Sequence, residues 1–289
     1  MDSCRKGRIF AVVKLKDMDY LKIYEEEHIK NGLSYSQIRK KYNISRGTWD
    51  YYVRQKLGKN ADQRKHRCND SFFDIIDSEI KAYLLGFLYA DGYISSDGRI
   101  GILLNVKDEE IVKLIQQFIA PNSEIKYINY QNFKRSPQVK IRFKSKRLYE
   151  RLQYFGFTTD KTHTHCKILC KIPEPFKKDF IRGFTDGDGS VRYSYYNTWY
   201  KVGISWSNGV PEILEEIQDY FNKCSGHLRS YDTYYILSFE KKDDVLVICK
   251  ELYENCTYYL RRKYINAINS IYYCSNTELK SKTKELDSV

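Results

Sequence analysis

Two short segments of the chain repeat one pattern, 97 residues apart (188 − 91). Residues 84–92 read LLGFLYADG, and residues 181–189 read IRGFTDGDG. Each is a largely apolar, helix-length run with small residues four positions apart, and each ends in Asp-Gly. Small residues at this spacing let two helix backbones approach closely, so we expect two helices packed along one seam. The expected seam residues are Gly86, Ala90, Gly183 and Gly187.

The same packing would bring two carboxylates together. Asp91 and Asp188 would emerge at the C-terminal ends of the two helices, where the helix dipole is negative and the two charges repel. Bound divalent cations would offset both costs, and a conflict of this kind is typical of a functional site. A single Asp-Gly would only turn the chain from helix to strand. Its repetition at equivalent points favours a metal site.

The repeat extends beyond the two segments. Residues 77–170 and 171–275 each follow the order α-β-β-α-β-β-α. This predicts an α+β fold in which two pseudo-symmetric units set two antiparallel sheets side by side as a saddle, with one face under helices and one exposed. An exposed face rich in Lys, Arg, Tyr and Asn suits a DNA duplex, which is itself pseudo-symmetric. We expect Asn105 and Arg142 on that face.

The net charge of +12 and the pI near 9.1 favour a polyanionic partner. No apolar run approaches the ~20 residues of a membrane span, and no signal-type segment opens the chain, so we expect no membrane partner. The eight cysteines lack framework spacing and are expected to be reduced. Whether His163, His165, Cys166 and Cys170 bind zinc stays open. Their spacing is not the usual one, which favours ordinary strand or loop residues.

Residues 1–58 indicate a small helical domain. Ser34 and Gln37 have the form of a capping box, and Ser45 can cap a following helix. The pattern is typical of a helix-turn-helix that binds DNA, although a three-helix packing module with a solvated basic face is the alternative. The outer face of the last helix would present Arg46, Asp50, Tyr51 and Arg54. We expect a basic linker over 59–76 and a C-terminal tail over 276–289.

The paired segments resemble the LAGLIDADG motifs of single-chain homing endonucleases. Residues 180–189, FIRGFTDGDG, keep both acidic positions of the motif, whereas Tyr89 replaces the first one in the other copy. Arg182 replaces a small residue and is expected to face away from the seam. The resemblance implies a saddle over DNA and cleavage of both strands across the minor groove.

The resemblance also implies site residues. The last acidic residue of each motif binds the catalytic metal in that family, which assigns Asp91 and Asp188 to two or more Mg²⁺ ions, together with backbone carbonyls at Ala90 and Gly187. Family members carry a basic residue late in each half that lines the water pocket. Lys161 and Lys263 hold those places and would position water or support transition-state charge. A plain surface charge is the alternative for each lysine.

The expected function is therefore a site-specific, metal-dependent double-strand DNA endonuclease with a long recognition site, acting as a monomer. A non-cleaving transcriptional regulator is the first alternative, although a regulator is expected to lose an aspartate and both are present. An intron RNA maturase is the second, with intron RNA as a further partner. The expected location is the cytoplasm of a bacterial or phage-infected cell, with an organelle as the alternative.

Overall fold

The structure is a computed structural model that describes residues 19–31, 33–53, 68–129, 136–159, 166–196 and 199–286. The chain divides into two compact units, Met1–Arg67 and Cys68–Val289. Residues 68–76 belong to the second unit, because Phe72, Phe73 and Ile76 are buried in its core. The linker expected over 59–76 therefore does not reach residue 76.

Four helical segments of the first unit lie wholly within the described residues. They are α1 (Tyr20–Ile23), the π-helical η1 (Tyr24–Lys30), α2 (Tyr35–Lys41) and α3 (Arg46–Tyr51). Ser34 and Gln37 form the reciprocal capping box at the start of α2, and the Ser45 hydroxyl accepts a hydrogen bond from the Thr48 amide at the start of α3. Asn43 has a φ of 52° in the intervening turn, a conformation that Asn tolerates better than most residues.

A small core closes this unit around Trp49. Ile38, Trp49 and Val53 are fully buried, as their spacing predicts. In the first helical segment Tyr20 is buried, whereas Leu21 is 49% exposed. The Tyr20 ring stacks on Tyr52 with centroids 3.9 Å apart, so an aromatic contact sets the orientation of this helix.

The second unit holds two copies of one element order, which confirms the predicted α-β-β-α-β-β-α repeat and the α+β class. The first copy comprises α4 (Glu79–Asp91), β1 (Gly92–Ile94), β2 (Arg99–Asn105), α5 (Glu109–Phe118), β3 (Lys126–Ile128), β4 (Gln138–Lys144) and α6 (Lys146–Tyr154). The second comprises α7 (Lys177–Asp188), β5 (Gly189–Tyr196), β6 (Trp199–Asn208), α8 (Glu212–Tyr220), β7 (His227–Ser230), β8 (Tyr235–Phe239) and α9 (Lys242–Tyr253). Short 3-10 turns occur at η3 (Val106–Asp108), η5 (Leu169–Lys171) and η6 (Glu174–Phe176).

A final helix, α10 (Arg261–Leu286), has no counterpart among the described elements of the first copy. It continues through position 276, where a tail was expected to begin. Tyr273 of α10 packs on Tyr200 of β6 with centroids 5.3 Å apart, and Tyr200 stacks on Tyr193 of β5. The long helix therefore covers the long β5–β6 hairpin. Among the described helices, none is both long enough and apolar enough to cross a bilayer.

The two sheets share one topology. Their strand orders are β1-β2-β4-β3 and β5-β6-β8-β7, and every pairing is antiparallel. Burial alternates along β2, where Ile100, Ile102 and Leu104 lie inside while Leu103 is 41% exposed. Alternation of this kind means that one face of the sheet packs under helices and the other faces solvent.

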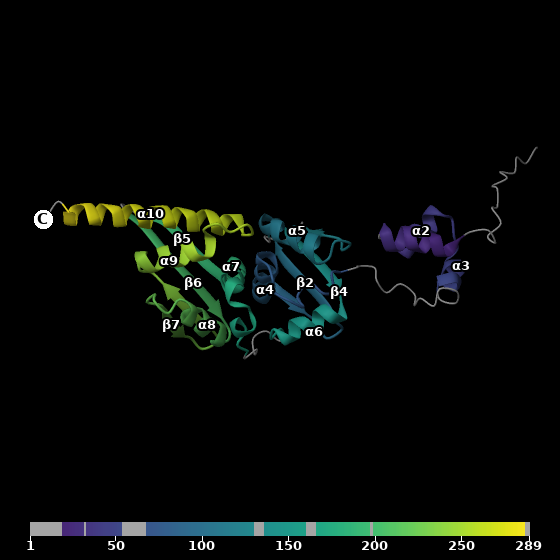
Figure 1. Cartoon of the computed structure of the whole chain (residues 1–289), viewed down its shortest axis with the longest axis horizontal. Coiled ribbons are helices and arrows are strands. Elements are labelled where there is room, and N and C mark those ends of the chain that lie inside the picture. The colour runs from purple at the N-terminus through teal and green to yellow at the C-terminus, as the bar shows by residue number, and fades with distance from the viewer. Residues whose placement is uncertain are drawn as a thin grey trace, which may run out of the picture. The chain divides into compact units, whose positions relative to one another are not determined.

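Helices α4 and α7 lie side by side between the two sheets (Figure 1). Their approach is limited by backbone atoms: a Cβ built on Gly86 would lie 2.0 Å from the Phe180 carbonyl oxygen, and one on Gly183 would lie 2.0 Å from the Tyr83 carbonyl oxygen. The contact is reciprocal under the pseudo-twofold. A little further along, a Cβ on Gly187 would lie 2.3 Å from that of Ala90. The four expected seam residues are thus brought together.

Replacing Gly183 by Ala is expected to force the two helices apart. Because the new methyl group would meet a backbone carbonyl rather than a flexible side chain, Gly183→Ala should lower the free energy of unfolding by roughly 3 kcal/mol or more. Chemical denaturation followed by circular dichroism measures the loss. Gly203→Ala is the matched control, since its Cβ would lie 3.5 Å from the nearest atom. Equal stability of the two variants would contradict the backbone contact.

Candidate metal centre at the end of the helix seam

The two seam helices end in the same way. Helix α4 ends at Asp91 and α7 at Asp188, and in each case the following glycine adopts extended dihedrals and begins a strand. Both aspartates are exposed, although most of each helix is buried. Asp91 lies against the other helix, since its Oδ2 would be 3.3 Å from a Cβ on Gly187. The end of the seam therefore presents carboxylate groups from both halves to solvent.

Lys263 of α10 holds the last turn of α7. Its Nζ donates hydrogen bonds to the carbonyl oxygens of Thr185, Asp186 and Gly187 at 2.8, 2.6 and 2.9 Å. These carbonyls belong to a helix end, which has no intrahelical donors for them, and a positive charge there is favoured by the helix dipole. An ammonium group has three donors, so these bonds use them all.

The environment of Lys263 is unusual for a lysine. The residue is 5% exposed. Burial lowers the pKa of its ammonium group to about 8, while the carboxylates of Asp186, Asp91 and Asp188 act in the opposite direction. Lys263 was expected to position water or to support transition-state charge. The structure instead places its ammonium group on backbone carbonyls next to Asp188.

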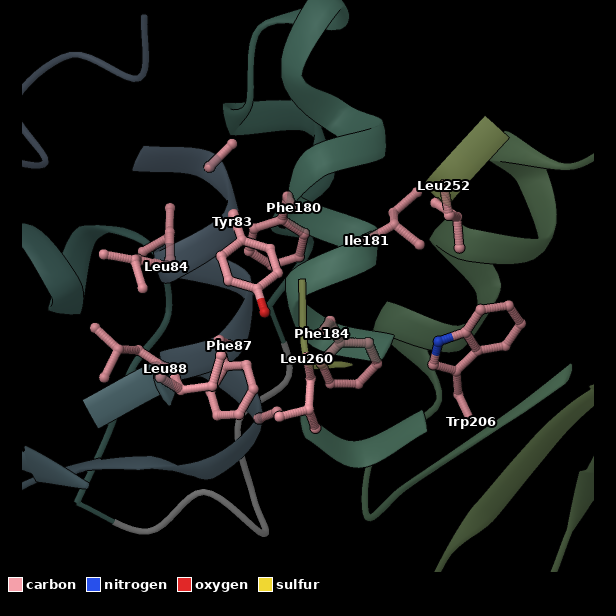
Figure 2. Close-up of a cluster of buried hydrophobic side chains, with 14 of the residues drawn as sticks. Tyr83, Leu84, Phe87, Leu88, Phe180, Ile181, Phe184, Trp206, Leu252 and Leu260 are labelled. Carbon is pink, nitrogen blue, oxygen red and sulfur yellow. The ribbon is translucent and has the colours of Figure 1, made fainter. Parts of the chain in front are cut away.

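Asp186 is fully buried beside the seam. Its carboxylate accepts hydrogen bonds from the Tyr83 hydroxyl at 2.9 Å, the Tyr253 hydroxyl at 2.8 Å and the Leu260 amide at 2.6 Å. Tyr83 reaches from α4 toward α7 (Figure 2), so this cluster joins both halves. Burial raises the pKa of the Asp186 carboxyl to about 6, although its donors and Lys263 oppose the increase. Sequence reasoning identified Asp186 only as a motif position.

Arg182 forms a second buried cluster. It is 1% exposed and donates to Glu79 of α4 at 2.7 Å and to Asp179 at 2.9 Å. Further bonds reach the carbonyl oxygens of Leu252 and Tyr258. The expectation that Arg182 faces away from the seam is therefore corrected in one respect: its guanidinium group ties the two seam helices together through Glu79. A buried guanidinium needs such partners because unpaired it would be very costly.

Each half also forms hydrogen bonds with residues near the C-terminal end of the other half. Glu216 of α8 accepts hydrogen bonds from the backbone amides of residues 168–170, which lie in the segment before α7. On the opposite side, Glu110 of α5 accepts a bond from the Arg261 amide at 2.8 Å. Arg262 binds Asp108 through two nitrogens, at 2.9 and 3.1 Å. These contacts keep α7 and α10 in place relative to the first half.

Several of the predicted site residues lie away from the end of the helix seam or outside the described residues. Lys161, His163, His165 and Arg54 lie outside the described residues. Among the residues that are described, no three His, Cys, Asp or Glu side chains form a metal-binding group. Asn105 is half-buried, and its amide oxygen accepts a bond from the Lys107 amide at 3.0 Å, so it caps η3. Arg142 is exposed on the solvent face of β4.

The predicted surface of α3 is exposed in the first unit. The Arg46 side chain is 81% exposed and lies 3.6 Å from the Asp50 carboxylate. Tyr51 is 53% exposed, with its ring packed edge-on against Tyr52. Arg46 and Tyr51 are exposed, whereas Asp50 between them is half-buried.

The pKa of Asp186 predicts a specific pH dependence. Because the folded pKa of about 6 lies above the ordinary aspartate pKa of 3.8, the neutral carboxyl favours folding and its ionisation opposes it. Stability relative to Asp186→Asn should therefore fall by about 3 kcal/mol as pH rises from about 3 to about 7. Paired denaturation curves of the two proteins across this range measure the difference. A difference that does not change with pH would contradict the assignment.

Comparison with known proteins gives the following relatives. No protein-family model matches the chain. Uncharacterized protein MJ0398 of Methanocaldococcus jannaschii is 25% identical over 230 residues, covering 75% of this chain and 76% of that protein. Among solved structures, I-SmaMI bound to uncleaved DNA target in the presence of calcium ions is 12% identical, with a TM-score of 0.48, over 69% of this chain and 92% of its own. The LAGLIDADG homing endonuclease I-GzeII in complex with DNA target is 13% identical, with a TM-score of 0.49, over 69% and 91%.

Proposed function

We propose that this chain is a metal-dependent DNA endonuclease of the LAGLIDADG type that cuts both strands of a duplex. One observation carries the proposal: two helices in backbone contact, each ending in an exposed aspartate, meet beside two sheets that each leave one face open. Two equivalent carboxylates suit two scissile phosphates related by the pseudo-symmetry of DNA. The net charge of +12 supports a polyanionic substrate.

The donor atoms at the seam end fit Mg²⁺. Asp91 and Asp188 supply carboxylate oxygens, and the carbonyls of Ala90 and Gly187 lie one residue before them. Mg²⁺ typically binds through one or two carboxylates and keeps water and substrate phosphate as its other ligands. The Gly187 carbonyl already accepts one bond from Lys263, and a carbonyl oxygen has a second lone pair. Bound there, Mg²⁺ would polarise the phosphoryl oxygen and help to supply the attacking hydroxide.

The protein's own residues prepare this site. Asp91 and Asp188 hold negative charge at helix ends where it is locally disfavoured, so they are poised for cations. Lys263 fixes the last turn of α7 and, with it, the backbone that carries Asp188. Arg182 and Asp186 keep α4 and α7 in register. We infer that these buried groups set the separation of the two carboxylates.

We propose that the first unit is a helix-turn-helix that binds DNA. Helices α2 and α3 flank the turn at Asn43, and α3 exposes Arg46 and Tyr51. Arg46 can contact phosphate or base edges, and a helix of this kind fits the major groove. A monomer then carries two DNA-binding units.

Asp91→Asn and Asp188→Asn are each expected to lower the rate of double-strand cleavage by at least about 100-fold, because loss of a metal-binding carboxylate removes several kcal/mol of transition-state stabilisation. Binding to the same duplex should persist. Cleavage is assayed with Mg²⁺ and with EDTA on DNA from the gene's own neighbourhood and its uninterrupted allele. Asp219→Asn, on the exposed surface of α8, is the matched control.

Undiminished cutting by both variants would contradict the site. Salt-sensitive binding without any metal-dependent cut by the wild-type chain would instead indicate a regulator, and preferential binding of intron RNA would indicate a maturase. Each outcome is read from the same gel-shift and cleavage series.

Lys263→Met is expected to act through position rather than through lost chemistry. Removal of the ammonium group leaves three carbonyls without their donor, so the free energy of unfolding should fall by about 1–3 kcal/mol. The Mg²⁺ concentration needed for half-maximal cleavage should rise, and added Mg²⁺ should restore much of the rate. A large loss of cleavage with unchanged stability and unchanged Mg²⁺ dependence would show a direct chemical role.

A further inference from the structure

The exposed faces of the two sheets have the same topology but different chemistry. Strand register and burial place five cationic side chains on the exposed face of the first sheet: Arg99, Lys126, Lys140, Arg142 and Lys144. The equivalent face of the second sheet carries five serines: Ser190, Ser194, Ser205, Ser207 and Ser238. It also carries three cations: Arg192, Lys201 and Arg229.

The cations on the exposed face of the first sheet lower its stability. Lys126 lies directly opposite Lys140 in the β3–β4 ladder, and Arg99 lies directly opposite Lys144 in the β2–β4 ladder. Like charges directly opposite each other destabilise a sheet. Asp97 and Glu124 reach Arg99 and Lys126 from the strand ends, at 2.5 and 3.4 Å, and both are exposed and therefore weak partners. Because these like-charged pairs lower the stability of the sheet, they indicate that the cations serve a function other than folding.

Arg142 is held in place on this face. Gly101 is its direct partner across the ladder, and a Cβ there would lie 2.9 Å from Arg142 Cγ and 2.6 Å from the Tyr93 hydroxyl oxygen. The absence of a side chain at Gly101 thus creates the space in which Arg142 and Tyr93 pack. A guanidinium group restrained at its stem has less freedom to lose on binding, which suits it to the bidentate recognition of guanine.

The second sheet presents a different surface. One row crosses all four strands through direct partners, Ser190 to Ser205, Ser205 to Ser238, and Ser238 to His227. Arg192 lies 3.7 Å from the Glu240 carboxylate, an exposed pair that is weak in the same way as those of the first sheet. Serine hydroxyl groups donate and accept, and they contact either purine or pyrimidine edges. The serine hydroxyl groups can therefore form hydrogen bonds with DNA without adding positive charge to this face.

We propose that the two sheets divide DNA binding unequally: the first anchors one half of the site through phosphates and an Arg142–guanine contact, and the second contacts the other half through hydroxyl groups. This inference rests on the proposed function, because it requires that both exposed faces lie on a duplex. The chemistry it assigns is a guanine-containing half-site on the first sheet.

The test compares two matched triple variants of the full chain on a random-sequence 40-bp duplex, in EDTA, across a salt series. K126Q/K140Q/K144Q should reduce the slope of log K against log salt by about 2.7, at about 0.9 for each lost phosphate contact. R192Q/K201Q/R229Q should reduce it by less than half as much. Relief of like-charge repulsion predicts that the first triple melts no lower than wild type.

A second measurement tests Arg142. Selection from a random duplex pool should yield a guanine in one half of the site, and Arg142→Gln should lower the preference for that guanine by at least about tenfold. Ser238→Ala, at the equivalent place in the second sheet, should leave it unchanged.

The outcomes separate this inference from the proposed function. Equal slope changes from the two triples, or a larger change from the second, would overturn the unequal division while leaving DNA binding intact. Absence of duplex binding by the wild-type chain at low salt would overturn the proposed function itself. If a triple variant fails to fold, Lys140→Gln against Lys201→Gln gives the same comparison, with an expected change of about 0.9 against less than half of that.

Discussion

The backbone contact between α4 and α7 is the constraint on which the second unit depends. At Gly86 and Gly183 each helix touches a carbonyl of the other at a distance that admits no side chain. The separation of the helices is therefore set by main-chain atoms, which vary less than packed side chains do. Everything attached to the helix ends inherits that separation, including both aspartates and the first strand of each sheet.

Because the helices are in close contact, polar groups near the seam lose access to water and need hydrogen-bond partners within the protein. Asp186 and Arg182 are both almost fully buried, and either would be costly without partners. Each has partners on α4, on α9 and in the segment that follows α9. Burial raises the pKa of Asp186 even with these partners in place. Burial of Asp186 and Arg182 therefore lowers stability, while their hydrogen bonds fix the positions of α4 and α7.

The sequence predicted the features that are local. Periodicity and paired small residues identified the seam helices, and the N-cap residues identified the starts of α2 and α3. The partners of Lys263, Asp186 and Glu216 could not be predicted, because each contact joins residues 46 or more positions apart and depends on the assembled fold. Asn105 lies on the same face of the first sheet as Arg142, because it is four residues along β2 from Gly101, the direct partner of Arg142, but its bond to the Lys107 amide was not predicted.

The Tyr83–Asp186 bond restricts which repeats can be joined. Reciprocity at the glycine contacts makes Phe180 the equivalent of Tyr83, and Tyr89 the equivalent of Asp186. Two copies of the second repeat would bury each Asp186 opposite a phenylalanine, whereas two copies of the first would have no carboxylate for Tyr83. Unlike repeats are therefore chemically complementary and like repeats are not. A gene rearrangement that joined like repeats would lose this bond, so the duplicated halves have become mutually dependent.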